Sequence, residues 1–132
     1  MKYSSKSSIK FRIKAVMKNK RIDRKLKLSE YATRCINKNQ LHEFLIANDW
    51  NNDKNELLND ISYIGFMECT ECGVIEIGDT ISDDKGIIVG TVIGFDYTHM
   101  PNHMNIVLKS VSTETGKERN YKVNQEFEIK GY

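Results

Sequence analysis

The residues best suited to chemistry lie between positions 96 and 103, in the run DYTHMPNH. This run contains two of the three histidines, His99 and His103, together with Asp96 and the single proline, Pro101. Imidazole is a common metal ligand and also an acid–base group that titrates near neutral pH. Because proline fixes its own φ, a loop that contains Pro101 can hold two imidazoles at a fixed separation. The run therefore predicts a site for metal binding or for acid–base chemistry.

A second motif, His42-Glu43 within the run LHEFLI, can add an imidazole or a carboxylate to this site. Consecutive side chains of a β-strand point to opposite faces, so in a strand only one of the two can join. A helix over residues 41–46 is the alternative, although the shortness of the run favours a strand. These polar residues are equally compatible with ordinary loop and surface positions.

The motif Cys69-x-x-Cys72-Gly73 resembles a tight turn that presents two thiolates to zinc. His99-x-x-x-His103 has the spacing of the histidine half of such a site, but 26 residues separate the two halves, against about 12–15 in zinc fingers. Zinc or another divalent metal is therefore one candidate cofactor. The odd number of cysteines, three, argues against a disulfide framework. We expect the third, Cys35, to be part of the core.

The charged residues are unevenly distributed along the chain. Residues 1–27 hold eleven Lys and Arg against one acid, and residues 28–132 hold nine against seventeen. Rows of cations suit a phosphate backbone, which gives an alternative function: a non-enzymatic module that binds nucleic acid or an acidic protein. The side chains expected to make these contacts are Lys10, Arg12, Lys14 and Arg24. The same charge distribution is also explained if the basic residues 1–27 pair with the acidic residues 28–132, either within one chain or in a second copy.

The elements that must position these residues are mainly strands. Apolar and charged residues alternate over residues 9–18, which predicts a half-buried strand, and residues 22–28 are expected to complete a basic hairpin with it. Ser29 is a typical N-cap, which predicts a helix that ends near Asn37. Further strands are expected at residues 61–69, 74–77, 86–97, 103–110 and 121–129.

These elements predict an α+β fold that is mostly β. We expect a small β-barrel with one short flanking helix, formed by residues 9–132 as a single domain after a frayed segment, residues 1–8. Two glycines inside the strand at 86–97, Gly90 and Gly94, allow the sheet to curl.

Membrane and secretory classes are not expected. No stretch approaches the roughly 20 apolar residues of a membrane helix, and the N-terminal residues lack the apolar run of a signal peptide. The sequence thus predicts a cytoplasmic protein whose ligand is a small molecule or a metal, and homo-oligomers are compatible with it.

Two resemblances add to this interpretation. The run VIEIGDTISDDKGIIVGTVIGFD resembles the opening of SH3-like or PRC-type small barrels. The series YATRCINKNQLHEF, YIGFMECTECGVIEIGD and VIGFDYTHMPNHMNIVL resembles a family of short bacterial proteins of unknown function. This second resemblance implies a compact β-rich domain and brings no activity with it.

Overall fold

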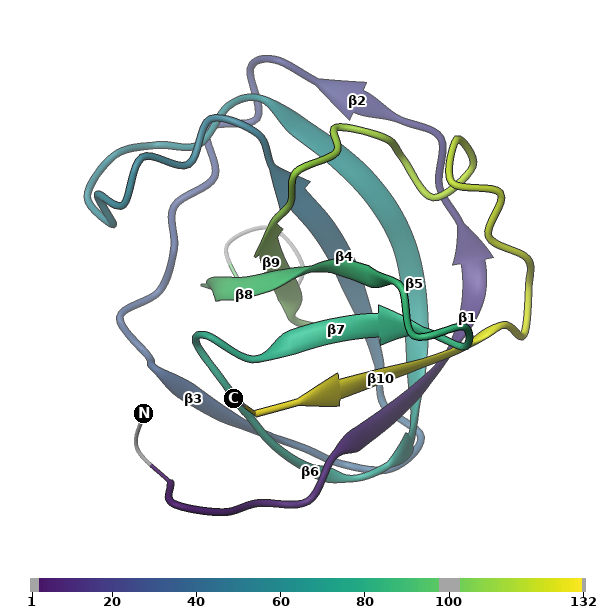
Figure 1. Cartoon of the computed structure of the whole chain (residues 1–132). Helices are drawn as coiled ribbons and strands as arrows, with labels where there is room; N and C mark the ends of the chain where they lie inside the picture. The colour runs from purple at the N-terminus through teal and green to yellow at the C-terminus, as the bar shows by residue number, and fades with distance from the viewer. Residues whose placement is uncertain (1–2, 98–102, 132) are drawn as a thin grey trace.

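The computed structural model describes residues 3–97 and 103–131, and within them the regular secondary structure consists of β-strands. Their order along the chain is shown in Figure 1. The strands are β1 (Ile9–Val16), β2 (Lys20–Arg21), β3 (Thr33–Ile36), β4 (Leu41–Ala47), β5 (Ile61–Glu71), β6 (Gly73–Glu76), β7 (Thr80–Asp83), β8 (Ile88–Asp96), β9 (Asn105–Lys109) and β10 (Glu126–Lys130).

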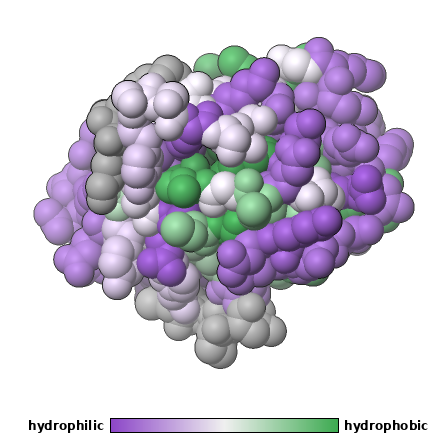
Figure 2. All heavy atoms as spheres, turned by 90° about the horizontal axis from the view of Figure 1, so that it is seen from below, coloured by the Kyte–Doolittle hydropathy of each residue, from purple (hydrophilic) through white to green (hydrophobic). Residues whose placement is uncertain are grey.

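Seven of these strands form a closed barrel. They lie in the order β1-β10-β7-β8-β9-β4-β5, and pairing between β1 and β5 closes the ring. The neighbouring pairs are antiparallel except β4 and β9, which are parallel. β2 extends the sheet beyond β5, and β3 pairs with β6 in a separate two-stranded sheet. Viewed from the end where β3 and β6 lie, the surface has an apolar centre bordered by hydrophilic side chains (Figure 2).

The barrel interior is apolar and contains large aromatic side chains. The alternation in β1 buries Ile9, Phe11 and Ile13 and directs the intervening cations outward, as the sequence predicts. Phe11 packs edge-on against Phe44, with 5.1 Å between the ring centroids. Each fully buried side chain of this kind stabilises the fold by roughly 1.5–3 kcal/mol. Hydrophobic burial inside the ring therefore holds the barrel together.

A second apolar cluster covers the outer face of part of the barrel. The connection from β2 to β3 runs down the outside of the ring (Figure 1), and its Leu26 forms a bridge with Leu58 of the long β4–β5 connection. Both leucines are buried against outward-facing apolar side chains of the barrel strands. The cluster comprises Leu26, Leu28, Leu45, Ala47, Leu58, Ile61, Tyr63, Ile93 and Val107.

The predicted helix after Ser29 is wrong: the chain forms strand β3 there, and the described residues contain no helix. β3 pairs with β6 instead, and Ile36 lies opposite Gly73 in that register. A Cβ atom at Gly73 would lie 2.9 Å from Cγ1 of Ile9, so glycine lets this sheet pack closely on β1. The partner strand lies far along the chain and is invisible to a local capping signal.

The predicted basic hairpin is also wrong. β1 pairs with β10 and β5, while the two residues of β2 pair with β5. Residues 22–28, expected as its second strand, instead cross the outer face of the barrel. Leu26 and Leu28 are buried, as expected, but in the outer cluster.

Within residues 3–97 and 103–131, no helix is long and apolar enough to span a membrane.

Candidate functional site

Three polar side chains meet on the outer face of the barrel, where β4, β8 and β9 lie side by side. In the parallel pair Glu43 is opposite Asn105, and in the antiparallel pair Asp96 is opposite the same asparagine. All three residues are buried. Since paired residues share a face of the sheet, the register brings Glu43, Asp96 and Asn105 together. Of these, Asn105 was not identified from the sequence.

Arg24 inserts into this cluster from the crossing connection. Its Nη2 lies 3.5 Å from Oδ2 of Asp96, and the two side chains are only 7 % and 1 % exposed. Nε of Arg24 donates to the Tyr63 hydroxyl at 3.1 Å, and Nδ2 of Asn105 donates to Oδ2 of Asp96 at 3.1 Å. A buried ion pair needs such additional hydrogen bonds to offset its desolvation. The prediction that Arg24 is part of an outward basic row is therefore wrong.

Glu43 differs from its neighbours because the described residues supply no hydrogen bond to its carboxyl group, although the residue as a whole is only 8 % exposed. Burial raises the pKa of Glu43 above its ordinary value, the positive charge of Arg24 opposes this shift, and the negative charge of Asp96 reinforces it. The group therefore holds a proton more readily than a carboxyl group in water.

His42 points to the opposite face from Glu43, as the strand alternation predicts. Its Nδ1 accepts a hydrogen bond from the Met104 N–H at 3.2 Å, and its Nε2 lies 3.4 Å from Oε1 of Gln40. These partners fit a neutral ring that carries its proton on Nε2. Burial and the nearby His103 lower the pKa of His42. Because both nitrogens have partners, His42 anchors the start of β9 and has no free nitrogen for a ligand.

His103 lies on the same side of the sheet as Glu43. Its ring packs edge-on against Phe66, with 5.0 Å between centroids, and Phe66 is the register partner of Glu43. Burial lowers the pKa of His103, and a hydrogen bond with the Asn105 side chain opposes the shift. His99 lies outside the described residues. Phe66 and Tyr63 lie in the strand predicted at residues 61–69 and were not identified from the sequence as site residues.

The pKa shifts at Glu43 and His103 are opposite in direction. The carboxyl pKa is raised and the imidazole pKa is lowered, so the proton affinities of the two groups approach each other. Such paired shifts are typical of groups that donate and accept protons near neutral pH. The Arg24–Asp96 pair supplies a fixed charge distribution beside Glu43.

The cysteines of the CxxC motif occupy different environments. Cys69 is buried in the barrel with its Sγ 3.2 Å from the Glu71 carbonyl oxygen, whereas Cys72 is exposed. Burial raises the pKa of the Cys69 thiol to about 11. Within the described residues, no group of three or more His, Cys, Asp or Glu side chains is placed to hold a metal. Since His99 lies outside those residues, the predicted four-ligand set stays a prediction.

The basic row of β1 faces outward, as predicted, and each of its cations approaches a glutamate on β5 or β10. The nitrogen–oxygen distances are 3.9 Å for Lys10–Glu71, 3.7 Å for Arg12–Glu126 and 4.0 Å for Lys14–Glu68. The basic row of β1 is therefore matched by acidic groups of the same molecule.

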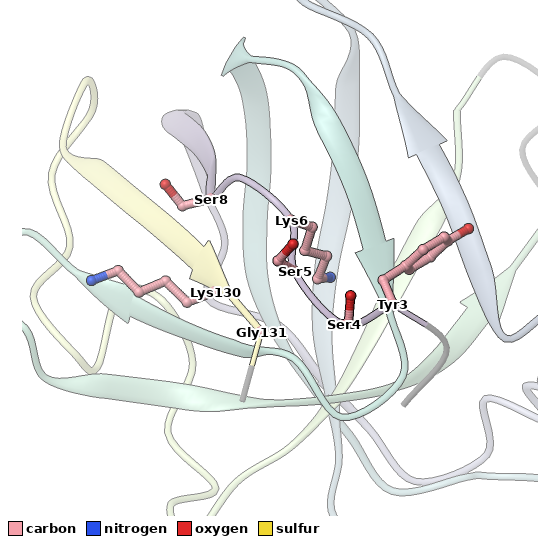
Figure 3. Close-up of a pocket in the computed structure, with 7 residues that line it drawn as sticks. All are labelled: Tyr3, Ser4, Ser5, Lys6, Ser8, Lys130 and Gly131. Atoms are coloured by element: carbon pink, nitrogen blue, oxygen red, sulfur yellow. The ribbon is translucent and has the colours of Figure 1, made fainter.

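A cavity of about 330 Å³ lies along the N-terminal segment, between three serines, Tyr3, two lysines and Gly131 (Figure 3). The ammonium group of Lys6 pairs with the fully buried Asp79 and donates to the Val74 carbonyl oxygen. Lys130 pairs with Glu128 at 3.3 Å, and Figure 3 shows the two lysine side chains pointing apart. Both lysines therefore pair with carboxylates, and among the described residues that line the cavity no charged groups converge on it.

The comparisons with known proteins give one family. The family model DUF6917, described as a family of unknown function, matches residues 3–130. This agrees with the resemblance to a family of unknown function. No curated protein and no solved structure matches the chain, so neither the SH3-like or PRC-type resemblance nor a bacterial origin gains support.

Proposed function

Because the chain belongs to DUF6917, a family of unknown function, we propose its function from the geometry: it binds a small polar molecule beside Glu43 and exchanges a proton with it. The observation that carries this proposal is the Glu43 carboxyl group. It is buried, it has no hydrogen-bond partner among the described residues, and its pKa is raised. The residue is largely buried while its carboxyl oxygens keep contact with the surface, so a ligand can reach them and supply a hydrogen bond that the described residues do not.

The neighbouring groups fit complementary roles in this proposal. A protonated Glu43 donates to an acceptor on the ligand, and the neutral imidazole of His103 accepts a proton. Arg24 holds Asp96, and Asp96 accepts from Asn105, so these three act as positioning residues. The chemistry supported is proton transfer on a metabolite.

Ligand-observed NMR with a library of polar metabolites tests this proposal. We expect at least one compound to bind the wild-type protein and to lose about tenfold in affinity in Glu43→Gln. The amide can donate a hydrogen bond but cannot give up its proton and form the charge-assisted bond that the carboxylate then makes with the protonated ligand. Glu71→Gln, which changes an exposed carboxylate, is the matched control. Absence of any bound compound, or equal affinity in Glu43→Gln and the wild type, would overturn the proposal.

The alternative of a nucleic-acid module has less support. Its proposed contacts Lys10, Arg12 and Lys14 are each within 4.0 Å of a glutamate oxygen, and Arg24 is buried. Binding of a DNA or RNA duplex that weakens steeply with salt, and that is lost in a Lys10→Gln, Arg12→Gln, Lys14→Gln variant, would favour this alternative.

A further inference from the structure

A second cavity, of about 500 Å³, lies where the connection from β2 to β3 faces the long β4–β5 connection. It shares no residue with the candidate site around Glu43. Its lining combines two lysines, a tyrosine, a serine and an asparagine with one acidic side chain. The lining residues are Lys27, Leu28, Ser29, Glu30, Tyr31, Lys54 and Asn55.

The two lysines give this cavity an uncompensated positive charge. Lys27 and Lys54 come from different connections, and within the described residues neither forms an ion pair. This distinguishes them from the cations of β1, each of which faces a glutamate. Glu30 is the single acidic side chain in the lining. The cavity therefore attracts an anion.

Ser29 adds a hydrogen-bonding group that is not satisfied by the protein. Its backbone N–H donates to the Phe95 carbonyl oxygen at 2.7 Å, which fixes this residue to the end of β8. Its hydroxyl oxygen is buried and has no hydrogen-bond partner in residues 3–97 and 103–131. Leaving such a group unpaired is costly. Because the oxygen has almost no accessible surface, the Ser29 side chain has to rotate toward the cavity before it can bind a ligand oxygen.

Tyr31 provides a planar surface at the same place. The guanidinium carbon of Arg34 lies 4.9 Å from the centroid of the Tyr31 ring and 5.1 Å from that of Tyr97, so the Arg34 cation contacts the faces of both rings. Arg34 forms no ion pair with a described residue, and its buried Nε has no hydrogen-bond partner there. Tyr31 remains 51 % exposed. Arg34 thus stiffens the tyrosine and adds a third positive charge beside the cavity.

We propose that this cavity binds a small aromatic anion of the chemical class of a nucleoside monophosphate. Lys27 and Lys54 contact the phosphate, the Ser29 hydroxyl hydrogen-bonds an oxygen of the ligand, and the exposed part of the Tyr31 ring stacks on the aromatic base. A cavity of about 500 Å³ falls in the usual range for small-molecule sites, about 300–1,000 Å³.

Isothermal titration of the full chain with three probes separates these contacts. The probes are adenosine 5′-monophosphate, adenosine without the phosphate and ribose 5-phosphate without the base. We expect the monophosphate to bind most tightly. The double variant Lys27→Gln, Lys54→Gln is expected to weaken both phosphorylated probes about tenfold and to leave adenosine unchanged.

Substitutions at Tyr31 test the stacking contact. Tyr31→Ala should weaken the monophosphate and adenosine about tenfold, the effect of losing a base–aromatic stack, whereas Tyr31→Phe should retain both affinities. The control double variant Lys38→Gln, Lys85→Gln removes two exposed lysines from outside the cavity lining. Thermal unfolding of each variant checks that the fold is kept.

Several outcomes would overturn the proposal. These are a monophosphate affinity no greater than that of ribose 5-phosphate, an equal effect of the two lysine double variants, or binding of an adenosine oligonucleotide without binding of the monophosphate. Glu43→Gln should leave monophosphate binding unchanged. Failure of this proposal is therefore distinguishable from failure of the proton-exchange site.

Discussion

The two faces of the barrel wall differ in chemistry at consecutive residues of the same strands. Phe44, Phe95 and Ile106 point into the barrel, where they are fully buried in an apolar cluster. The residues beside them, Glu43, Asp96 and Asn105, point outward and are also buried, because the connection from β2 covers them. Burial alone therefore does not separate core from site in this protein. The inner face buries apolar side chains, whereas this part of the outer face buries charged and amide side chains beside the apolar outer cluster.

This difference has an energetic consequence. The inner face gains stability from apolar area removed from water. The outer face contains a buried ion pair, whose attraction only offsets the desolvation of its members. We therefore expect the inner face to dominate the stability of the fold, while the outer face can hold groups of altered proton affinity. The following substitutions test that division.

The largest effect is expected inside the barrel. Phe44→Ala removes a fully buried ring that packs edge-on against Phe11, and the loss should be about 4 kcal/mol of unfolding free energy. Urea denaturation measures this loss. Leu41→Ala, at a partly exposed position of the same strand, is the control and should cost far less. Equal losses at the two positions would contradict the assignment of the core.

Breaking the outer ion pair should have the next largest effect. Arg24→Met leaves the buried Asp96 without its charged partner and should lower the unfolding free energy by about 3 kcal/mol. Adding Asp96→Leu should restore much of that loss, because the uncompensated charge is then gone. The single variant Asp96→Leu completes the comparison. If the unfolding free energy lost in the double variant equals the sum of the losses in Arg24→Met and Asp96→Leu, the two side chains are not energetically coupled.

Glu43→Gln should have a smaller effect, and one that depends on pH. The pKa of Glu43 is raised in the folded state from 4.5, so its contribution to stability is fully present below pH 4.5 and is lost as pH rises through the folded-state value. Relative to the wild type, the variant should gain about 1 kcal/mol of stability on going from pH 4 to pH 7.5, a typical single-site effect.

Urea denaturation across this pH range measures the change, and Glu71→Gln is the exposed control. A stability difference between Glu43→Gln and the wild type that stays constant with pH would show that the carboxyl group is not perturbed.

The smallest effect is expected at the basic row of β1. Replacing Lys10, Arg12 and Lys14 by Gln removes three ion pairs between exposed or half-buried groups, each worth about 0–1 kcal/mol. The loss should shrink further at high salt, because salt screens exposed charges. Thermal unfolding at low and high sodium chloride concentration measures it. A loss that is large and independent of salt would mean that these side chains support the fold in another way.

The sequence predicted the features that depend on local pattern. The alternation around Phe11 indicated β1, the short run at residues 41–46 favoured a strand, and the opposite orientation of His42 and Glu43 followed from that strand. These predictions succeeded because the side-chain period of a strand is two, whatever its partner.

The wrong or missing predictions concern residues whose structure depends on partners distant in the sequence. Ser29 carries a capping residue type, but the chain after it pairs with β6 and forms no helix. Arg24 is one cation among many in the N-terminal segment, and only the fold brings it to Asp96. Asn105 belongs to the site because β9 lies between β8 and β4. Local periodicity contains no information on which strand lies beside which.

The pairing of β1 with β10 also determines how the molecule reaches its folded state. Phe11 lies opposite Phe127, so the barrel cannot close until the chain has been synthesised as far as β10. Joining such distant segments costs entropy before their contacts can stabilise the chain. This cost slows folding, and β-rich proteins of this kind fold in about milliseconds to seconds. During synthesis, β1 leaves the ribosome long before its partner β10, so one edge of β1 stays unpaired until residues 126–130 have been made. A newly made chain is therefore vulnerable to aggregation, and its yield should depend on chaperones more than the stability of the finished barrel suggests.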